Sequence, residues 1–427
     1  MLSGASGQGG TDDEVDVLLI VASDDRRDLD DEVDRLRDDL VGATTIFEET
    51  GTILPGALAG HEHFGFLDGV AQPGIRGRLS SAPHDVLTLR QNPNDRGQGK
   101  PGQDLLWPGE FVFGYPGQNP AAGDIAEPGP ISNAGPHWSV NGSFLVFRRL
   151  RQRIHAFHRF LRDTAASLGV PAPAGASAAR LVGSRLVGRW QSGAPTVRTP
   201  DDENAGLADD DCANNNFELQ EASETVPPTG FASPFDCVDN VFPSSPGDPN
   251  GVRCPFTGHI RKTYPRDDEM NIPPGGADSD SGDGLNEVTT QTHRLLRRGI
   301  PWGGVSPSTP EAPIDDGRTR GLHFLAYQTS IEDQFEFVTR FWVNNPDFKE
   351  AFGTDADDPI TRGGHDPIIG QNNTPGENRR REFTVTFNGS GGTEQHARAS
   401  TTADWVIPTG GGYFFAPSMS ALTMLAS

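Results

Sequence analysis

The spacing of hydrophobic residues predicts a strand, a helix and a second strand near the start of the chain. Residues 15–22 form a short, almost continuous apolar run, as expected of a strand that is buried on both faces. Residues 44–50 have the pattern of another strand. Between these two segments, apolar residues recur at near-helical spacing among charged ones, and Gly42 is placed to end the helix. The apolar residues of this helix are Leu29, Val33, Leu36 and Leu40. The order strand, helix, strand is half of an α+β sandwich.

The same two patterns continue through the rest of the chain. Further strands are predicted at 109–115, 143–150, 323–331 and 411–419. A helix is predicted at 151–168, and its apolar face consists of Ile154, Phe157, Phe160 and Leu161. Another helix is predicted at 332–344, and its buried side consists of Phe335, Val338, Phe341 and Trp342.

Segments rich in glycine, proline and polar residues interrupt these patterns. Residues 81–108 are typical of a linker or a long surface loop, so a new domain can start after them. Residues 196–250 and 265–290 are polar and lack periodicity, and we interpret them as insertions. The sequence therefore predicts two domains, residues 1–107 and residues 108–427.

The composition is that of a globular protein with an acidic surface. The chain has 427 residues, of which 34% are hydrophobic, and a formal net charge of -24 at pH 7. This charge argues against binding of nucleic acid, whose phosphates would be repelled. No stretch approaches ~18 consecutive apolar residues and no export signal is visible, so we expect no membrane span and a cytoplasmic location. The three cysteines have no C-x-x-C spacing, so we expect reduced thiols and no zinc site.

Asp68 lies between two glycines in the segment GFLDG (65–69). This segment fits a simple turn, because glycine and aspartate are both typical turn residues. It also fits a second interpretation, in which Gly65 and Gly69 let the backbone approach a flat ligand and Asp68 acts on that ligand as acid or base. The segment by itself leaves both interpretations open.

His259 lies among small and apolar residues in the segment CPFTGHIRKTYPR (254–266). An isolated histidine commonly has a structural role, but imidazole is also the common axial ligand of haem iron. Arginines close to such a ligand suit the two haem propionates, and Arg261 and Arg266 are candidates for this contact.

Arg297 precedes a Gly-Ile-Pro break in the segment HRLLRRGIPWG (293–303). The break would hold its guanidinium rigidly at the end of an element, and a solvated basic face is the alternative.

Two candidate metal sites are discarded. His61 and His63 have no matching set of carboxylates, and the aspartates of 278–283 lack the spacing of a calcium loop.

Taken together, five segments resemble motifs of the dye-decolourising peroxidase family and occur in that family's order. They are GFLDG at 65, CPFTGHIRKTYPR at 254, HRLLRRGIPWG at 293, GLHFLAYQTSIEDQFEF at 321 and GGYFFAPSMSAL at 411. The resemblance is to the longer members with large insertions. It implies an α+β fold of two ferredoxin-like domains, related to the dimeric α+β barrel, with haem mainly in the second. It also implies that the first domain is incomplete here, without its initial strand, helix and strand.

The resemblance assigns three residues to the binding of one haem b per chain. His259 matches the axial iron ligand, and Arg266, seven positions later, matches an arginine that meets a propionate. Asp404 matches, more loosely, an acid that accepts the hydrogen bond of the imidazole Nδ1–H. Such an acceptor makes the imidazole more electron-donating and favours the higher oxidation state of the iron.

On the other face of the haem, the resemblance places Asp68, Arg297 and Phe324. Asp68 would move the proton of hydrogen peroxide, Arg297 would stabilise the charge that develops as the O–O bond breaks, and Phe324 would line the pocket. Because the reference pKa of aspartate is about 3.9, we expect activity to lean acidic.

The function implied by the resemblance is that of a haem-dependent peroxidase. Such an enzyme reduces hydrogen peroxide and oxidises bulky dyes or phenolic and aromatic donors in one-electron steps. One alternative is a haem-binding or haem-processing protein with little peroxidase turnover, and another is a non-redox α+β binding module. The natural reducing substrate and the oligomeric state, a homo-oligomer included, stay open.

Overall fold

The structure is a computed structural model, and it describes most of the chain. The described residues are 15–82, 85, 87–88, 99–121, 127–133, 135–223, 242, 244–268, 287–349, 363–389 and 392–427. The α-helices are α1 (Arg26–Asp39), α2 (Ile154–Leu168), α3 (Ala178–Val187), α4 (Ala205–Asp209), α5 (His259–Thr263), α6 (Glu287–Thr290) and α7 (Met419–Leu425). The short 3₁₀ turns are η2 (Gly56–Leu58), η3 (Pro108–Glu110), η4 (His137–Ser139) and η6 (Gln291–His293), and one long π-helix consists of η7 (Ile331–Glu336) and η8 (Val338–Val343). The strands are β1 (Gly74–Ile75), β2 (Leu105–Leu106), β3 (Ser143–Gln152), β4 (Leu296–Arg297), β5 (Ile300–Trp302), β6 (Gly321–Gln328), β7 (Arg381–Asn388), β8 (Glu394–Thr401) and β9 (Val406–Ala416).

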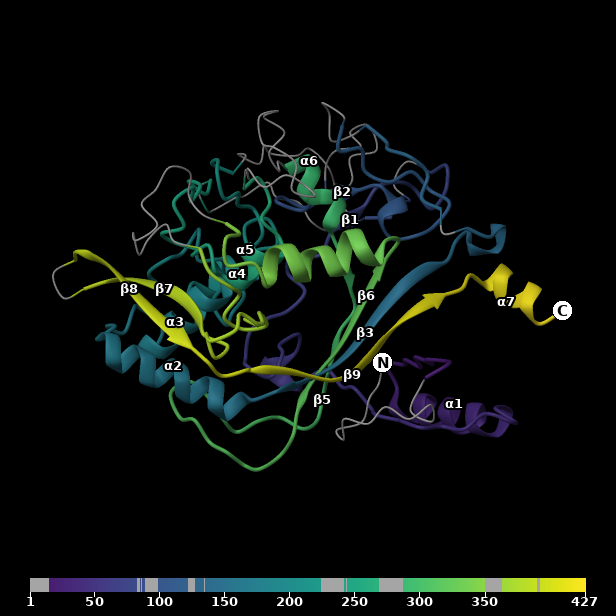
Figure 1. The fold of residues 1–427 in the computed structure, drawn as a ribbon, viewed down its shortest axis with the longest axis horizontal. Coiled ribbons are helices and arrows are strands. Elements are labelled where there is room, and N and C mark those ends of the chain that lie inside the picture. The colour runs from purple at the N-terminus through teal and green to yellow at the C-terminus, as the bar shows by residue number, and fades with distance from the viewer. Residues whose placement is uncertain are drawn as a thin grey trace.

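A five-stranded antiparallel sheet forms the centre of the molecule. Its order is β4-β6-β3-β9, and β5 also pairs with β6. Figure 1 shows its long strands β6, β3 and β9 side by side. The strands predicted at 143–150, 323–331 and 411–419 all lie in this sheet, although β9 begins earlier, at Val406. Since successive residues of a strand point to opposite faces, β6 presents Phe324 to one face and Leu325 to the other.

The main hydrophobic core lies to one side of this sheet, where α2 packs against α3 and the hairpin β7–β8. The predicted face of α2 is confirmed, because Ile154, Phe157 and Leu161 are buried and Phe160 is partly buried. The helix ends at Gly169, whose left-handed backbone (φ 66°) suits glycine. The core also takes up two residues of the loop that carries Asp68, Phe64 and Phe66. Helices and antiparallel strands segregate as in an α+β fold, and this prediction of the fold class is confirmed.

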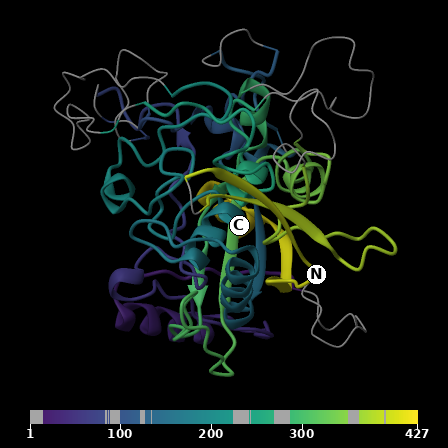
Figure 2. The same ribbon diagram turned by 90° about the vertical axis from the view of Figure 1, so that its left-hand side faces the viewer.

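The N-terminal segments do not form the two strands that the sequence predicts. The helix is present as α1, and Asp25 caps it by accepting hydrogen bonds from the backbone N–H groups of the first turn, but none of its residues is buried. Residues 15–22 and 44–50 are not strands, and Val17 and Ile46 are more than half exposed, at 67% and 51%. Figures 1 and 2 place α1 on the opposite side of the sheet from the π-helix. The two strand predictions are wrong because an apolar run shows that a segment suits burial, whereas a strand also requires a hydrogen-bonded partner.

Two predictions in the second predicted domain are wrong in detail. Residues 109–115 are not a strand but continue from η3 into turns, and Phe111 and Phe113 are buried there without pairing. The predicted helix 332–344 is a π-helix, whose wider turn shifts the buried face relative to an α-helix. Phe341 is therefore 39% exposed, although it was predicted to be buried.

The predicted insertions lie partly outside the described residues, and the division into two domains stays a prediction. Among the described residues, none of the helices combines the length and hydropathy of a membrane span. Cys212 is disulfide-bonded, so the expectation of reduced thiols is wrong for this residue. Cys254 is free and buried.

Candidate active site

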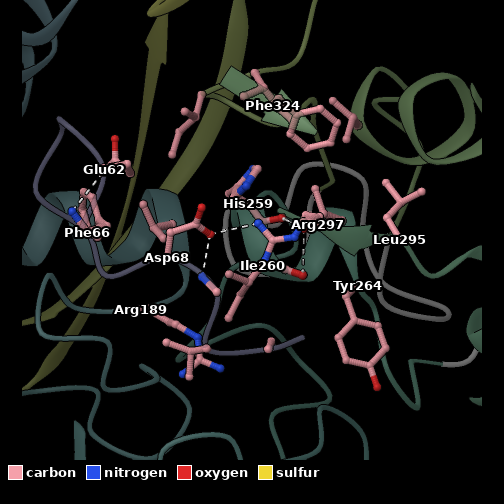
Figure 3. A pocket seen from close by; sticks show the side chains of 18 of the residues that line it. Glu62, Phe66, Asp68, Arg189, His259, Ile260, Tyr264, Leu295, Arg297 and Phe324 are labelled. Atoms are coloured by element: carbon pink, nitrogen blue, oxygen red, sulfur yellow. Dashed lines mark hydrogen bonds and ion pairs between the residues drawn. The ribbon is translucent and has the colours of Figure 1, made fainter. Parts of the chain in front are cut away.

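A pocket lies where the sheet, the π-helix, α5 and the loop that carries Asp68 meet. Its wall combines large apolar side chains with charged ones (Figure 3). The apolar lining includes Phe66, Leu150, Phe217, Phe324, Phe335, Val338 and Ile369. The charged and titratable lining includes Glu62, Asp68, Arg189, His259, Arg266, Arg294 and Arg297. The fold therefore brings Asp68, His259, Arg266, Arg297 and Phe324, which the sequence singled out from separate segments, into one pocket.

The loop that ends at Asp68 is a turn and also points its aspartate into the pocket. Gly65 and Gly69 have positive φ angles of 94° and 83°, a backbone region that strongly favours glycine. A Cβ atom on Gly65 would lie 2.7 Å from Nε2 of Gln191, at the end of a side chain that can move, so the positive φ is the stronger reason for glycine there. The backbone N–H of Asp68 donates to the carbonyl of Gly60 at 2.9 Å. The turn thus fixes the backbone from which the carboxylate projects.

Asp68 and Arg297 form an ion pair inside the pocket. Nη1 of Arg297 donates to Oδ1 of Asp68 at 2.9 Å, and about a third of each side chain is exposed, 32% and 35% respectively. Figure 3 shows the two side chains turned toward each other beside His259. Arg297 ends β4, and Gln72 holds its backbone by donating to the carbonyl at 2.9 Å and accepting from the N–H at 3.2 Å. The guanidinium is therefore held at the end of an ordered element.

The pKa of Asp68 lies below the ordinary value for aspartate. Burial acts to raise this pKa, but the positive charge and hydrogen bond of Arg297 and the backbone N–H of Gly69, 2.7 Å from Oδ1, outweigh it. Asp68 is consequently ionised at neutral pH and in mild acid.

His259 begins α5 and is oriented by a buried carboxylate. Its Nδ1 donates to Oδ2 of Asp366 at 2.7 Å. Oδ1 of Asp366 accepts from the backbone N–H groups of Ile368 and Ile369, at 2.7 and 3.1 Å, so the carboxylate is held on both sides. Because a carboxylate only accepts, Nδ1 carries the proton and Nε2 has a free lone pair. No described residue forms a hydrogen bond with Nε2, which leaves it available to a metal.

The expectation that Asp404 accepts this hydrogen bond is wrong. Asp404 instead pairs with Arg379 and Arg381. Asp366 is 107 residues beyond His259 in the sequence, and only the fold brings the two together. No motif in the sequence points to Asp366 as the partner.

Replacing Asp366 by asparagine will weaken binding of haem, whereas Asp404→Asn will not. The asparagine amide can donate to Nδ1, which favours the tautomer with its proton on Nε2, and loss of such a partner typically reduces metal affinity by about 10–100-fold. Titration of both apo-variants with haem, followed by absorbance, measures the difference. If the Asp404 variant alone lost affinity, the assignment of Asp366 would be wrong.

Two buried arginines make one part of the pocket positive. Arg189 donates to the carbonyls of Gly193 and Asn214 and to Oδ1 of Asn215, and none of the described carboxylates pairs with it. Burial, together with the charge of Arg266, lowers the pKa of Arg189 to about 9. Arg266 donates to the same Oδ1 at 2.7 Å. Nη1 of Arg266 also lies 3.8 Å from Oε1 of Glu218, so Arg189 is the buried guanidinium that gains most from an anion in the adjoining pocket.

These groups fit a haem. The pocket supplies one neutral imidazole nitrogen for iron, apolar walls for the macrocycle and buried cations for the propionates. Arg266 has a left-handed backbone (φ 55°), which is unusual for a residue other than glycine and strains the backbone at this position. The sequence did not single out Arg189, although it lies in the segment GRWQSGAPT (188–196), which also resembles the longer members of the dye-decolourising peroxidase family and is the signal that could have found it. Phe324 lines the pocket with its ring 6.0 Å from that of Phe335.

Comparisons with known proteins show what the chain as a whole is similar to. No family model matches the chain. A dye-decolourising peroxidase of Mycena epipterygia is 32% identical over 418 residues, which cover 96% of this chain and 66% of that protein. One of Auricularia auricula-judae is 32% identical over 95% of this chain and 64% of that protein. The chain therefore spans about two thirds of the length of these curated relatives.

Solved structures support the same relationship. An ancestral D-type dye-decolourising peroxidase matches with a TM-score of 0.64 and 31% identity, over 94% of this chain and 72% of that one. The peroxidase of Auricularia auricula-judae matches with a TM-score of 0.60 and 31% identity, again over 94% and 72%. The resemblance inferred from the five sequence motifs is confirmed. The fold and these relatives together show that the chain, with the pocket described above, belongs to the dye-decolourising peroxidase family.

Proposed function

We propose that this protein is a haem peroxidase that reduces hydrogen peroxide and oxidises bulky dyes or phenolic and aromatic donors by one-electron steps. The observation that carries this proposal is the ion pair of Asp68 and Arg297 in the pocket that His259 also lines. A haem carrier needs an axial ligand alone, whereas this pocket adds a basic oxygen and a fixed positive charge. A solved relative has been determined in complex with 2,6-dimethoxyphenol, which supports phenols as one class of donor.

We take the cofactor to be one haem b per chain. The chain has no C-x-x-C-H motif for covalent attachment, which favours a non-covalently bound haem. Nε2 of His259 would bind the iron, and Arg189 and Arg266 would meet the propionates. When bound, the haem supplies the iron that receives hydrogen peroxide and stores the two oxidising equivalents.

The polar residues of the pocket then have separate tasks. Within the described residues, Oδ2 of Asp68 accepts no hydrogen bond, so it is the oxygen free to take a proton from hydrogen peroxide and return it to the departing oxygen. Arg297 presents a fixed charge that stabilises the negative charge developing as the O–O bond breaks. Asp366 keeps the proton of His259 on Nδ1 and so strengthens Nε2 as an electron donor.

The direct test has two readings on the purified protein after addition of haem. A Soret band together with bleaching of an anthraquinone dye that depends on hydrogen peroxide is the expected result. A Soret band without bleaching would instead favour the haem-binding or haem-processing alternative, and absence of the band would favour a non-redox module.

The rate of reaction with hydrogen peroxide should stay near its maximum as the pH falls from neutral to about 4. The reason is that the pKa of Asp68 is lowered, so its basic form persists above that pKa and is lost only as the pH falls through it. Stopped-flow measurement of the first reaction with hydrogen peroxide, without a donor, gives this profile. A single acidic limb centred near neutral pH would assign the base to another group.

A further inference from the structure

A second carboxyl, Glu62, lies in the pocket wall on the same loop as Asp68 and has no task in the function proposed above. It lines the pocket and lies to one side of Asp68 in Figure 3. Removal from bulk water, with the nearby negative charge of Asp68, raises the pKa of Glu62 to about 7. The pKa values of the two carboxyls of this loop are thus shifted in opposite directions: that of Asp68 is lowered and that of Glu62 is raised.

Four hydrogen bonds of Glu62 close the loop that leads to Asp68. Its Oε2 accepts from the backbone N–H of Phe64 at 2.8 Å, and its Oε1 accepts from that of Phe66 at 2.9 Å. Its own backbone N–H donates to the carbonyl of Phe66 at 3.0 Å, and its carbonyl accepts from Gly65 at 2.9 Å. Asp68 follows two residues later. The position of the catalytic carboxylate therefore depends on the carboxyl of Glu62.

Gln152, at the end of β3, is the remaining side-chain partner of Glu62. Its Nε2 donates to Oε2 of Glu62, while its own Oε1 is buried and has no hydrogen-bond partner. Turning this amide over would bring Oε1 to the carboxyl instead. The amide can therefore donate to an ionised Glu62 or accept from a protonated one, and both backbone N–H bonds stay in place.

We propose that Glu62 is the positioning residue of the peroxide site, and that Gln152 lets it hold the loop of Asp68 whether Glu62 is ionised or protonated. The inference rests on the proposed function, in which Asp68 handles the proton of hydrogen peroxide. Around Glu62, the charge that acts on it is that of Asp68, which Arg297 in turn partly neutralises. His158 of α2 reaches the same loop through the carbonyl of Phe64, and burial lowers the pKa of His158, so it is neutral there at neutral pH.

The first test uses hydrogen exchange of the full chain, read for the peptide that contains Phe64 and Phe66, with and without haem. Glu62→Gln replaces one accepting oxygen by an NH₂ group, which cannot accept from the backbone N–H groups of Phe64 and Phe66. Exchange of this peptide should therefore be about 10-fold faster at every pH. Gln152→Met keeps the size of the side chain and removes the amide. It should exchange about 10-fold faster than the unchanged protein both at about pH 9, where ionised Glu62 loses a donor, and at about pH 5.5, where the buried O–H of Glu62 lacks an acceptor.

The second test is the rate of reaction with hydrogen peroxide in the same variants. Gln152→Met should react about 10-fold more slowly on both sides of pH 7, because Glu62 loses a donor when it is ionised and an acceptor when it is protonated. Glu110→Gln is the matched control, because Glu110 also has a pKa raised to about 7 and accepts a backbone N–H, that of Gln118, but does not line the pocket. It should leave the rate unchanged.

The outcomes separate this inference from the proposed function. Unchanged exchange in Glu62→Gln, or unchanged exchange in Gln152→Met at either pH value, would overturn the role of the pair. If Asp68→Asn reacts with hydrogen peroxide like the unchanged protein, the proposed function fails, while the exchange measurements still report on the loop.

Discussion

Replacing His259 by alanine will abolish stable binding of haem. Among the described residues that line the pocket, His259 offers an imidazole Nε2 that is available to iron and is held in place, because Asp366 fixes the proton on Nδ1. Without this ligand the iron has no protein bond, and the apolar walls and arginines retain the macrocycle only weakly. We expect the Soret band and the haem content per chain to fall to background, as measured by absorbance and by extraction of haem as its pyridine complex.

His155→Ala is the matched control for this experiment. His155 lies on α2, outside the pocket lining, and contacts Asp315 at 3.5 Å near the surface. Its replacement should leave haem content unchanged, and circular dichroism of both apo-variants should show that they remain folded. A Soret band of unchanged position and stoichiometry in His259→Ala would mean that another residue is the axial ligand.

Replacing Arg297 by leucine will slow the reaction with hydrogen peroxide by about 100–1,000-fold, the usual cost of losing one preorganised electrostatic donor. The structure adds a second reason for a large effect. Arg297 is the main group that lowers the pKa of Asp68, so its removal leaves burial to raise that pKa. The variant should therefore lose charge stabilisation. In acid, a smaller fraction of its Asp68 should also be ionised and able to act as the base.

Asp68→Asn removes the basic oxygen but leaves Arg297 with an amide oxygen to contact. We expect Arg297 to be at least as important as Asp68, and stopped-flow spectra with hydrogen peroxide in the absence of a dye measure this step directly. The acidic limb of Arg297→Leu should also move to higher pH, because the folded-state pKa of Asp68 is then raised. Arg298→Leu, at the exposed neighbouring position, is the control and should react normally. If Arg297→Leu kept the normal rate and Asp68→Asn did not, Arg297 would have no part in cleaving the O–O bond.

Much of the secondary structure was accessible from the sequence because the pattern of one element reports on its own burial. The periodicity of α2 placed Ile154, Phe157 and Leu161 on a buried face, as the structure does. The same reasoning failed for 15–22 and 44–50, since pairing depends on a second segment that the pattern of the first cannot reveal. It also failed for Phe341, because the choice of π- over α-winding changes which residues share a face.

The local motifs determined which residues to examine, and the tertiary structure decided how they are partnered. Asp68, His259 and Arg297 each stand in a distinctive segment, so the sequence by itself led to them and to the family. Their environment comes from groups far along the chain: Asp366 is 107 residues from His259, and Arg297 is 229 residues from Asp68.

Contacts at such separations depend on loop paths and packing, which leave no periodicity or spacing in the sequence. For this reason the sequence pointed to Asp404 where the fold places Asp366, and it did not show that Arg189 is a buried cation of the pocket or that Glu62 makes hydrogen bonds to its loop. The residue types in the sequence indicated the chemistry of the site. The pKa values, the imidazole tautomer and the side-chain orientations that this chemistry needs arise only when the folded chain removes water and brings the distant partners together.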